Sequence, residues 1–176
     1  MMVSKISRLA GILQVMTVAA LVLLPLAAIW AVASGLTDPD SIRPQFPDVE
    51  IAMLPPGKAL AVGLLGIVGL LPGVLALWWM RALFQGYRRG EILTPASAEL
   101  IRRIGGALVV LALAGVVMET AQVLVLTIDN PAGERMLSVG FGGNFFGAIL
   151  AGGLLVVIGW AMREAAHAAE ENAGFV

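Results

Sequence analysis

Four long apolar runs constrain the fold of this chain more than any other feature. They cover residues 9–33, 57–83, 104–128 and 141–162, and each supplies the roughly 20 mostly apolar residues that a helix needs to cross a bilayer. Hydrophobic residues make up 59% of the chain and charged residues only 13%. A water-soluble domain of this size could not cover so much apolar surface. The sequence therefore predicts one all-α domain over residues 1–176, an integral membrane four-helix bundle.

Positive charge predicts how the bundle faces, because Lys and Arg concentrate in cytoplasmic loops. Eight of the 11 lie in the two terminal segments or in the stretch 81–103: Lys5, Arg8, Arg81, Arg88, Arg89, Arg102, Arg103 and Arg163. The remaining ones, Arg43, Lys58 and Arg135, lie in or beside the other two loops. We therefore expect both termini in the cytoplasm.

The first run has an alternative interpretation as a cleaved signal peptide. Lys5 and Arg8 precede it, and the small residues Ala31 and Ala33 resemble a cleavage site. The apolar run is longer than the roughly 7–15 residues of a signal peptide, which favours a permanent membrane helix. Either interpretation leaves the orientation of the other three runs unchanged.

The third run carries an acidic side chain deep within its apolar stretch, Glu119. Ala112, Gly115, Glu119 and Gln122 recur at helical spacing and share one face. Glu119 falls in the outer third of the expected span, and Asn144 enters the fourth run from the same side. We expect Gln122 and Asn144 to be the hydrogen-bonding partners of Glu119 in an intramembrane polar site.

Two interpretations of Glu119 remain open. An intramembrane carboxylate is by default a candidate functional group, because it can relay protons or bind a cation or a basic ligand. This interpretation predicts a small transporter or channel-like protein. The alternative is structural: a low dielectric disfavours the charged form, so a protonated Glu119 can be hydrogen-bonded within the bundle.

Small residues predict where helices approach closely, because packing in lipid depends on close backbone contact. The second run contains Gly63, Gly66, Gly69 and Gly73, and the fourth contains the ladder Gly143, Gly147 and Ala151. These faces can pack within the bundle or between copies of the chain in a homo-oligomer. Pro25 and Pro72 are expected to kink their helices, since each removes a backbone donor.

The loop between the second and third runs has its own helix signals. The second helix is expected to stop near Gly90, and Thr94 followed by Pro95 predicts the start of the third. Glu99 is placed to pair with Arg102 and Arg103. Four arginines of this region are candidate contacts for anionic lipid or an acidic partner surface: Arg88, Arg89, Arg102 and Arg103. The alternative is that they determine topology alone.

The two outer loops and the C-terminal segment give weaker signals. Residues 49–53 and 136–141 have a pattern that allows extended segments, which would pair as a small cap. Six acids in these loops lack regular ligand spacing and predict a solvated surface, not a metal site: Asp38, Asp40, Asp48, Glu50, Asp129 and Glu134. The fourth helix should continue into the cytoplasm, where Glu170 and Glu171 can dock on the basic loop and His167 is a surface residue.

Several chemistries are excluded or unsupported. The absence of cysteine excludes disulfides and thiol catalysis. The chain has no phosphate-binding glycine loop or hydrolase motif, and its one histidine, His167, lies far from any candidate partner. A net charge of −1 argues against direct binding of nucleic acid. We expect no enzymatic activity, no catalytic residue, no cofactor and no metal site.

Two stretches resemble a known family. Residues 83–105, LFQGYRRGEILTPASAELIRRIG, resemble the cytoplasmic middle loop of a bacterial inner-membrane family, domain of unknown function 2975. The C-terminal segment MREAAHAAEENAGFV is similar to that family's closing helix, and Leu93 departs from the aromatic residue common there. The resemblance implies four spans in a bacterial inner membrane and no settled activity. Members are often encoded beside a small helix-turn-helix regulator, which implies a non-catalytic membrane partner for a regulator, or an accessory subunit of a larger membrane complex.

Overall fold

The computed structural model describes residues 2–131 and 135–173, with side chains except at 2–6, 143 and 169–173. Its elements are α1 (Met2–Thr37), the short 3-10 helix η1 (Pro39–Gln45), α2 (Pro56–Arg88), α3 (Pro95–Thr127) and α4 (Gly143–Ala173). The four long helices are long and apolar enough to cross a membrane. The all-α prediction is confirmed, and no strand occurs in the described residues.

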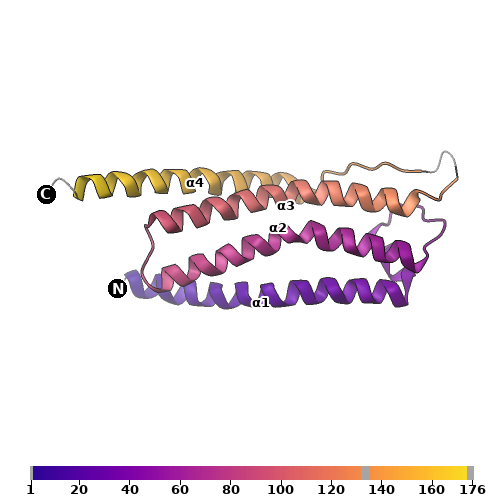
Figure 1. Cartoon of the computed structure of the whole chain (residues 1–176), viewed down its shortest axis with the longest axis horizontal. Coiled ribbons are helices and arrows are strands. Elements are labelled where there is room, and N and C mark those ends of the chain that lie inside the picture. Colours follow the sequence, from indigo (N-terminus) through magenta and orange to yellow (C-terminus); the bar gives the residue numbers. More distant parts are fainter. Residues whose placement is uncertain (1, 132–134, 174–176) are drawn as a thin grey trace.

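The long helices lie side by side in chain order (Figure 1). Close backbone contacts join α1 to α2, α2 to α3 and α3 to α4, and among the described residues α1 has none with α3 or α4. The predicted four-helix bundle is therefore present but open, because its first and last helices do not meet. We use "inner end" for the end that holds the loop from α2 to α3, and "outer end" for the other.

Glycines of α2 pack against the helices on either side. A Cβ atom added at Gly63 would lie 2.7 Å from Val32 Cγ2 of α1, and one at Gly69 would lie 3.3 Å from Met118 Cγ of α3. Gly66 and Gly73 likewise face α3. The glycines of the second run thus allow close packing within the chain.

The contact between α3 and α4 is closer still, but it does not use the expected ladder. A Cβ atom at Gly105 would lie 2.5 Å from the carbonyl oxygen of Gly152, and one at Gly159 would lie 2.9 Å from that of Ala98. By contrast, a Cβ atom at Gly147 would meet nothing within 4 Å. The prediction that Gly147 packs within the bundle is therefore wrong, because α4 turns a different set of glycines toward α3.

Buried side chains gather at the two ends of the bundle. The outer cluster combines loop and helix residues: Ile42, Ile51, Ala59, Val62 and Leu126. The inner cluster contains Leu83, Ile101 and Ile104, with Trp79 and Met162 packed against it.

The outer loops form a cap, which one buried asparagine holds together without strand pairing. The Asn130 side chain donates to the Glu50 carbonyl at 2.7 Å and accepts from the Ala52 amide at 3.3 Å. Lys58 pairs with Asp129 at 2.9 Å and also donates to the Leu126 carbonyl at 3.3 Å, near the end of α3. The expected pairing of residues 49–53 with residues 136–141 is not found among the described contacts, because Asn130 binds the first segment and Met136 hydrogen-bonds instead to the Thr127 hydroxyl.

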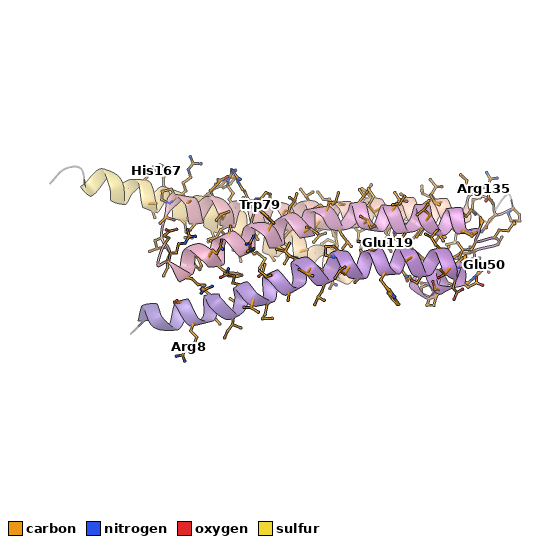
Figure 2. The ribbon with its side chains drawn as sticks, turned by 60° about the horizontal axis from the view of Figure 1, so that its bottom comes forward. Arg8, Glu50, Trp79, Glu119, Arg135 and His167 are labelled. Atoms are coloured by element: carbon orange, nitrogen blue, oxygen red, sulfur yellow. The ribbon has the colours of Figure 1, made fainter. Side chains whose placement is uncertain are left out.

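Both helices with an internal proline continue through it. Pro25 lies inside α1 and Pro72 inside α2. α2 bends near its middle in Figure 1, and α1 bends in Figure 2. A proline removes one backbone hydrogen bond and crowds the preceding turn, which accounts for the bends.

Candidate functional site

Glu119 lies on α3 in the half of the molecule nearer the outer end (Figure 2). Glu119 is exposed on the surface of the protein. The described residues provide it with no hydrogen bond and no ion pair. The structural interpretation, in which Glu119 is hydrogen-bonded inside the bundle, therefore has no support from the described contacts.

The two expected partners of Glu119 behave differently. Gln122 donates its side-chain amide to the Val62 carbonyl of α2 at 3.0 Å, so it links two helices. Asn144 lines a cavity together with Glu119, without a hydrogen bond between them among the described contacts. The structure thus brings the three predicted residues to one region but does not join them into a hydrogen-bonded cluster.

Two cavities adjoin the Glu119 side chain. One, of about 380 Å³, lies between α2 and α3 and includes Gln45 and Phe46 at the outer end. The other, of about 290 Å³, lies between α3 and α4 and includes Gly140 and Phe145. Glu119 and Gly115 line both cavities, so the carboxylate stands on the ridge between them.

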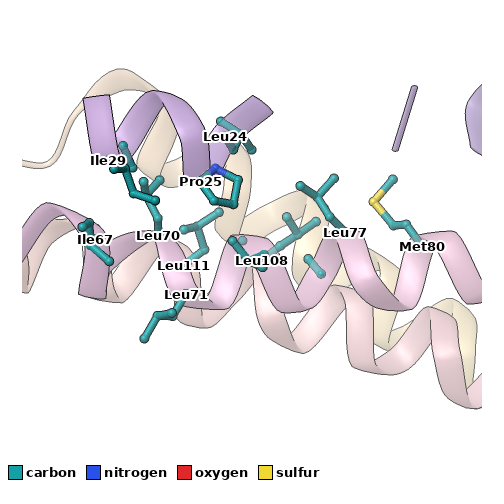
Figure 3. A pocket seen from close by; sticks show the side chains of 14 residues that line it. Leu24, Pro25, Ile29, Ile67, Leu70, Leu71, Leu77, Met80, Leu108 and Leu111 are labelled. Atoms are coloured by element: carbon teal, nitrogen blue, oxygen red, sulfur yellow. The ribbon is translucent and has the colours of Figure 1, made fainter. Parts of the chain in front are cut away.

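A third cavity extends the same hollow surface along the membrane-spanning part of the chain. It has a volume of about 440 Å³, and its lining from α1, α2 and α3 is almost wholly apolar. Figure 3 shows Pro25 on its α1 wall facing Leu70 and Leu77 of α2. Leu111 lines this cavity and both cavities beside Glu119. We call these three neighbouring cavities together the open groove.

Sequence reasoning missed four residues that surround Glu119: Gln45, Phe46, Gly140 and Phe145. Gln45 and Phe46 come from the end of η1, Gly140 from the second outer loop and Phe145 from the first turn of α4. A Cβ atom at Gly140 would lie 3.7 Å from Glu119 Oε1, so the second outer loop passes close to the carboxylate. No local pattern could have identified these residues, because their position depends on how the outer loops fold over the helices.

The loop at the inner end is built as the sequence predicted. Thr94 is the N-cap of α3, and its hydroxyl accepts from the Ser97 amide at 3.2 Å. Gly90 has a φ of 87°, a conformation that favours glycine, and it follows the last residues of α2. Ser97 also donates to the Glu91 carbonyl at 2.8 Å, which fixes the loop against α3.

The four arginines of this loop have different surroundings. Arg102 and Arg103 both pair with Glu99, at 2.9 and 2.8 Å. These hydrogen bonds lower the pKa of the Glu99 carboxyl to about 2. Arg88 donates to Gln14 of α1 at 2.9 Å, whereas Arg89 is exposed. The arginines do not converge on one site, and the charge of two of them is partly offset by Glu99.

The C-terminal part of α4 extends past the rest of the bundle. α3 and α4 are antiparallel, and Gly159 packs beside Ala98, three residues after α3 begins at Pro95. The segment 163–173, which we call the α4 arm, therefore projects beyond α3 at the inner end (Figure 1). The expected docking of Glu170 and Glu171 concerns side chains outside the described part of the structure.

The chain matches a known family. The model of a family described as "Protein of unknown function (DUF2975)" matches residues 34–174. The matched region includes the last residues of α1, the outer cap, α2, α3 and all of α4. Searches of curated proteins and of solved structures find no match.

Proposed function

Because this chain belongs to the family of proteins of unknown function DUF2975, its role must be inferred from its own structure, and we propose that it is a non-catalytic membrane partner protein. In this proposal it lies in a bacterial inner membrane with both termini in the cytoplasm. Its inner end holds a cytoplasmic regulator or a neighbouring subunit of a membrane complex. The family assignment itself carries no activity.

The α4 arm is the observation that carries this proposal. Its 11 residues, 163–173, continue α4 at the inner end, where α4 contacts only α3 among the described helices. The arm continues a helix that is already formed, but most helical stability in proteins comes from tertiary packing, and the arm projects beyond α3. A partner that packs along the arm would supply the tertiary contacts that stabilise such a helix.

The end of α2, which lies at the same inner end of the molecule, gives the partner an electrostatic preference. Arg89 is exposed beside the glycine that ends α2, and Arg88 uses one of its donors on Gln14. An acidic surface on a regulator or a neighbouring subunit would complement these arginines. Such contacts at the rim of an interface steer association more than they add affinity.

Site-specific photocrosslinking in native membranes tests the proposal. A photoreactive residue at Ala165 on the arm, or at Ile92 in the inner loop, should crosslink to the same partner. The matched control at Leu137, exposed in the outer loop, should not. Arg89→Glu should reduce the yield at Ala165. A protein that purifies alone in gentle detergent and crosslinks at neither inner position would contradict the proposal.

The exposed position of Glu119 favours one second candidate, a small transporter or channel-like protein. Its open cavities give a solute access to the carboxylate from the outer half of the molecule. Flux of ions or organic cations into liposomes should then fall strongly in Glu119→Ala. Equal flux in the two proteins, or none in either, would remove this candidate.

A further inference from the structure

The partner role at the inner end leaves the open groove without a function. Glu119 is an exposed acidic residue within a mostly apolar span. Ionisable side chains in membrane segments are costly and usually face a protein interior or a cavity with a partner. The structure places Glu119 on a hollow surface, so its complement must come from something that enters the groove.

The basic residues of the outer end are occupied elsewhere. Lys58 pairs with Asp129 at 2.9 Å, and Arg43 pairs with Asp40 at 2.7 Å. Arg135 donates to the Asn130 carbonyl at 3.3 Å. None of these described contacts reaches Glu119, so the groove presents a negative charge without a positive side chain beside it.

The surroundings of the carboxylate suit an organic cation. Phe46 lines the cavity on one side of Glu119, and Phe145 lines the cavity on the other. Aromatic faces attract cations, most strongly where water is excluded. Gln45 and Asn144 add amide oxygens, whose partial negative charge also stabilises a cation. The two cavities, of about 380 and 290 Å³, are near the lower limit of roughly 300 Å³ for ligand pockets.

The third cavity provides space for an apolar tail. Leu111 precedes Glu119 by eight residues on α3, a distance of about 12 Å at the helical rise. From Leu111 the groove continues into the apolar cavity of about 440 Å³ beside Pro25 and Leu70. A molecule with its charge at Glu119 would therefore extend its hydrocarbon part between α1 and α3, over α2.

We propose that the open groove binds an amphipathic organic cation, with the charged group at Glu119 and the apolar tail in the cavity beside Pro25. The proposal concerns binding only and is independent of the partner role at the inner end. Its chemical class is an alkylated ammonium or a similar lipophilic cation. The groove selects this class because a neutral lipid leaves the carboxylate uncompensated, and an anion is repelled by it.

Equilibrium binding to the full chain in phosphatidylcholine nanodiscs tests the charge preference. The probe is tetraphenylphosphonium, and the matched control is tetraphenylborate, which has similar size and opposite charge. Tetraphenylphosphonium should bind saturably above the level of empty nanodiscs, and tetraphenylborate should not. Glu119→Gln should weaken binding at least tenfold, whereas Glu119→Asp should retain most of it. Val117→Gln, on the other exposed face of α3, should bind as the wild type does.

Competition tests the position of the tail. Dodecyltrimethylammonium should displace tetraphenylphosphonium at a much lower concentration than tetramethylammonium, which has the same charged group and no tail. Ala28→Phe places a larger side chain in the apolar cavity. It should raise the concentration of dodecyltrimethylammonium needed for displacement several-fold, with little effect on tetraphenylphosphonium itself.

Three outcomes would overturn the proposal. Equal binding of tetraphenylphosphonium and tetraphenylborate to the wild type would show adsorption without charge selection, and this comparison needs no variant. Unchanged binding in a folded Glu119→Gln variant would place the site elsewhere. Equal competition by the long-tailed and tail-free cations would exclude the apolar cavity. None of these results bears on crosslinking at the inner end, so the two proposals can fail separately.

Discussion

At the scale of single residues, Asn130 has the clearest structural role. It is 2% exposed and bonds the backbone of the first outer loop at Glu50 and Ala52. Asn130→Ala would remove both of these partly buried hydrogen bonds, each of which should contribute about 0.5–1.5 kcal/mol. Thermal unfolding in detergent measures the loss, and Ser138→Ala in the exposed loop is the control. Equal stability of the two variants would show that the loops hold together by other contacts.

Glu99 is the residue that gives the inner loop its pH dependence. Arg102 and Arg103 lower the pKa of its carboxyl from 4.5 to about 2. When folding lowers the pKa of a carboxyl, that carboxyl stabilises the fold at pH values above its unfolded-state pKa. This stabilisation is lost as the pH falls from 4.5 toward about 2.

Glu99→Gln should therefore remove part of the acid sensitivity in that pH range. Because the pair is largely solvated, we expect a change of less than about 1 kcal/mol near neutral pH. The check is the melting temperature of the wild type and the variant across the pH range. Parallel curves would show that the two ion pairs contribute nothing to stability.

At the scale of elements, the contact between α3 and α4 depends on backbone approach. A methyl group at Gly105 would meet the Gly152 carbonyl oxygen at 2.5 Å, whereas one at Gly106 would meet nothing within 4 Å. Gly105→Ala should therefore separate the helices, at a cost of about 1–3 kcal/mol for overpacking.

Gly106→Ala is the matched control, since it adds the same methyl group one position along the same helix. It should be neutral or slightly stabilising, because alanine favours a helix more than glycine does. Unfolding in detergent and resistance to proteolysis compare the two variants. Similar stability for both would mean that α4 can move away from α3 without cost.

The helix ends and the helix faces differ in how far sequence could predict them. The start of α3 at Thr94 and Pro95 followed from local chemistry, because an N-cap hydroxyl bonds an amide of the same turn. The packing face of α4 did not, because small residues lie on several of its faces. Gly152 and Gly159 contact α3 while Gly147 remains open.

At the scale of the whole molecule, the testable property is orientation. The chain has no cysteine, so a single introduced cysteine reports the side of the membrane on which it lies. Arg89 and Ser41 are exposed residues of opposite ends. In right-side-out spheroplasts, a membrane-impermeant maleimide should label the Ser41→Cys variant directly. It should label the Arg89→Cys variant only after permeabilisation, and the reverse pattern would invert the proposed topology.

The candidate site was predictable in part. Glu119 stood out because it is an acid within an apolar run, and Asn144 does lie beside it in one cavity. Gln122 shares its helix face but bonds the Val62 carbonyl, because α2 passes next to it. Phe46 and Phe145 reach the same region only through the fold of the outer loops and the start of α4.

The sequence by itself determined that this protein has four membrane-length helices. It also determined where the second helix ends and the third begins, and which acidic side chain lies within an apolar run. These properties depend on hydrophobic length and on contacts within one helical turn. Only the tertiary structure decided that α1 and α4 do not meet and that Glu119 faces an open groove. In lipid, several apolar faces of a helix are nearly equivalent in hydrophobicity, so shape complementarity between particular helices selects which faces pack and which remain open.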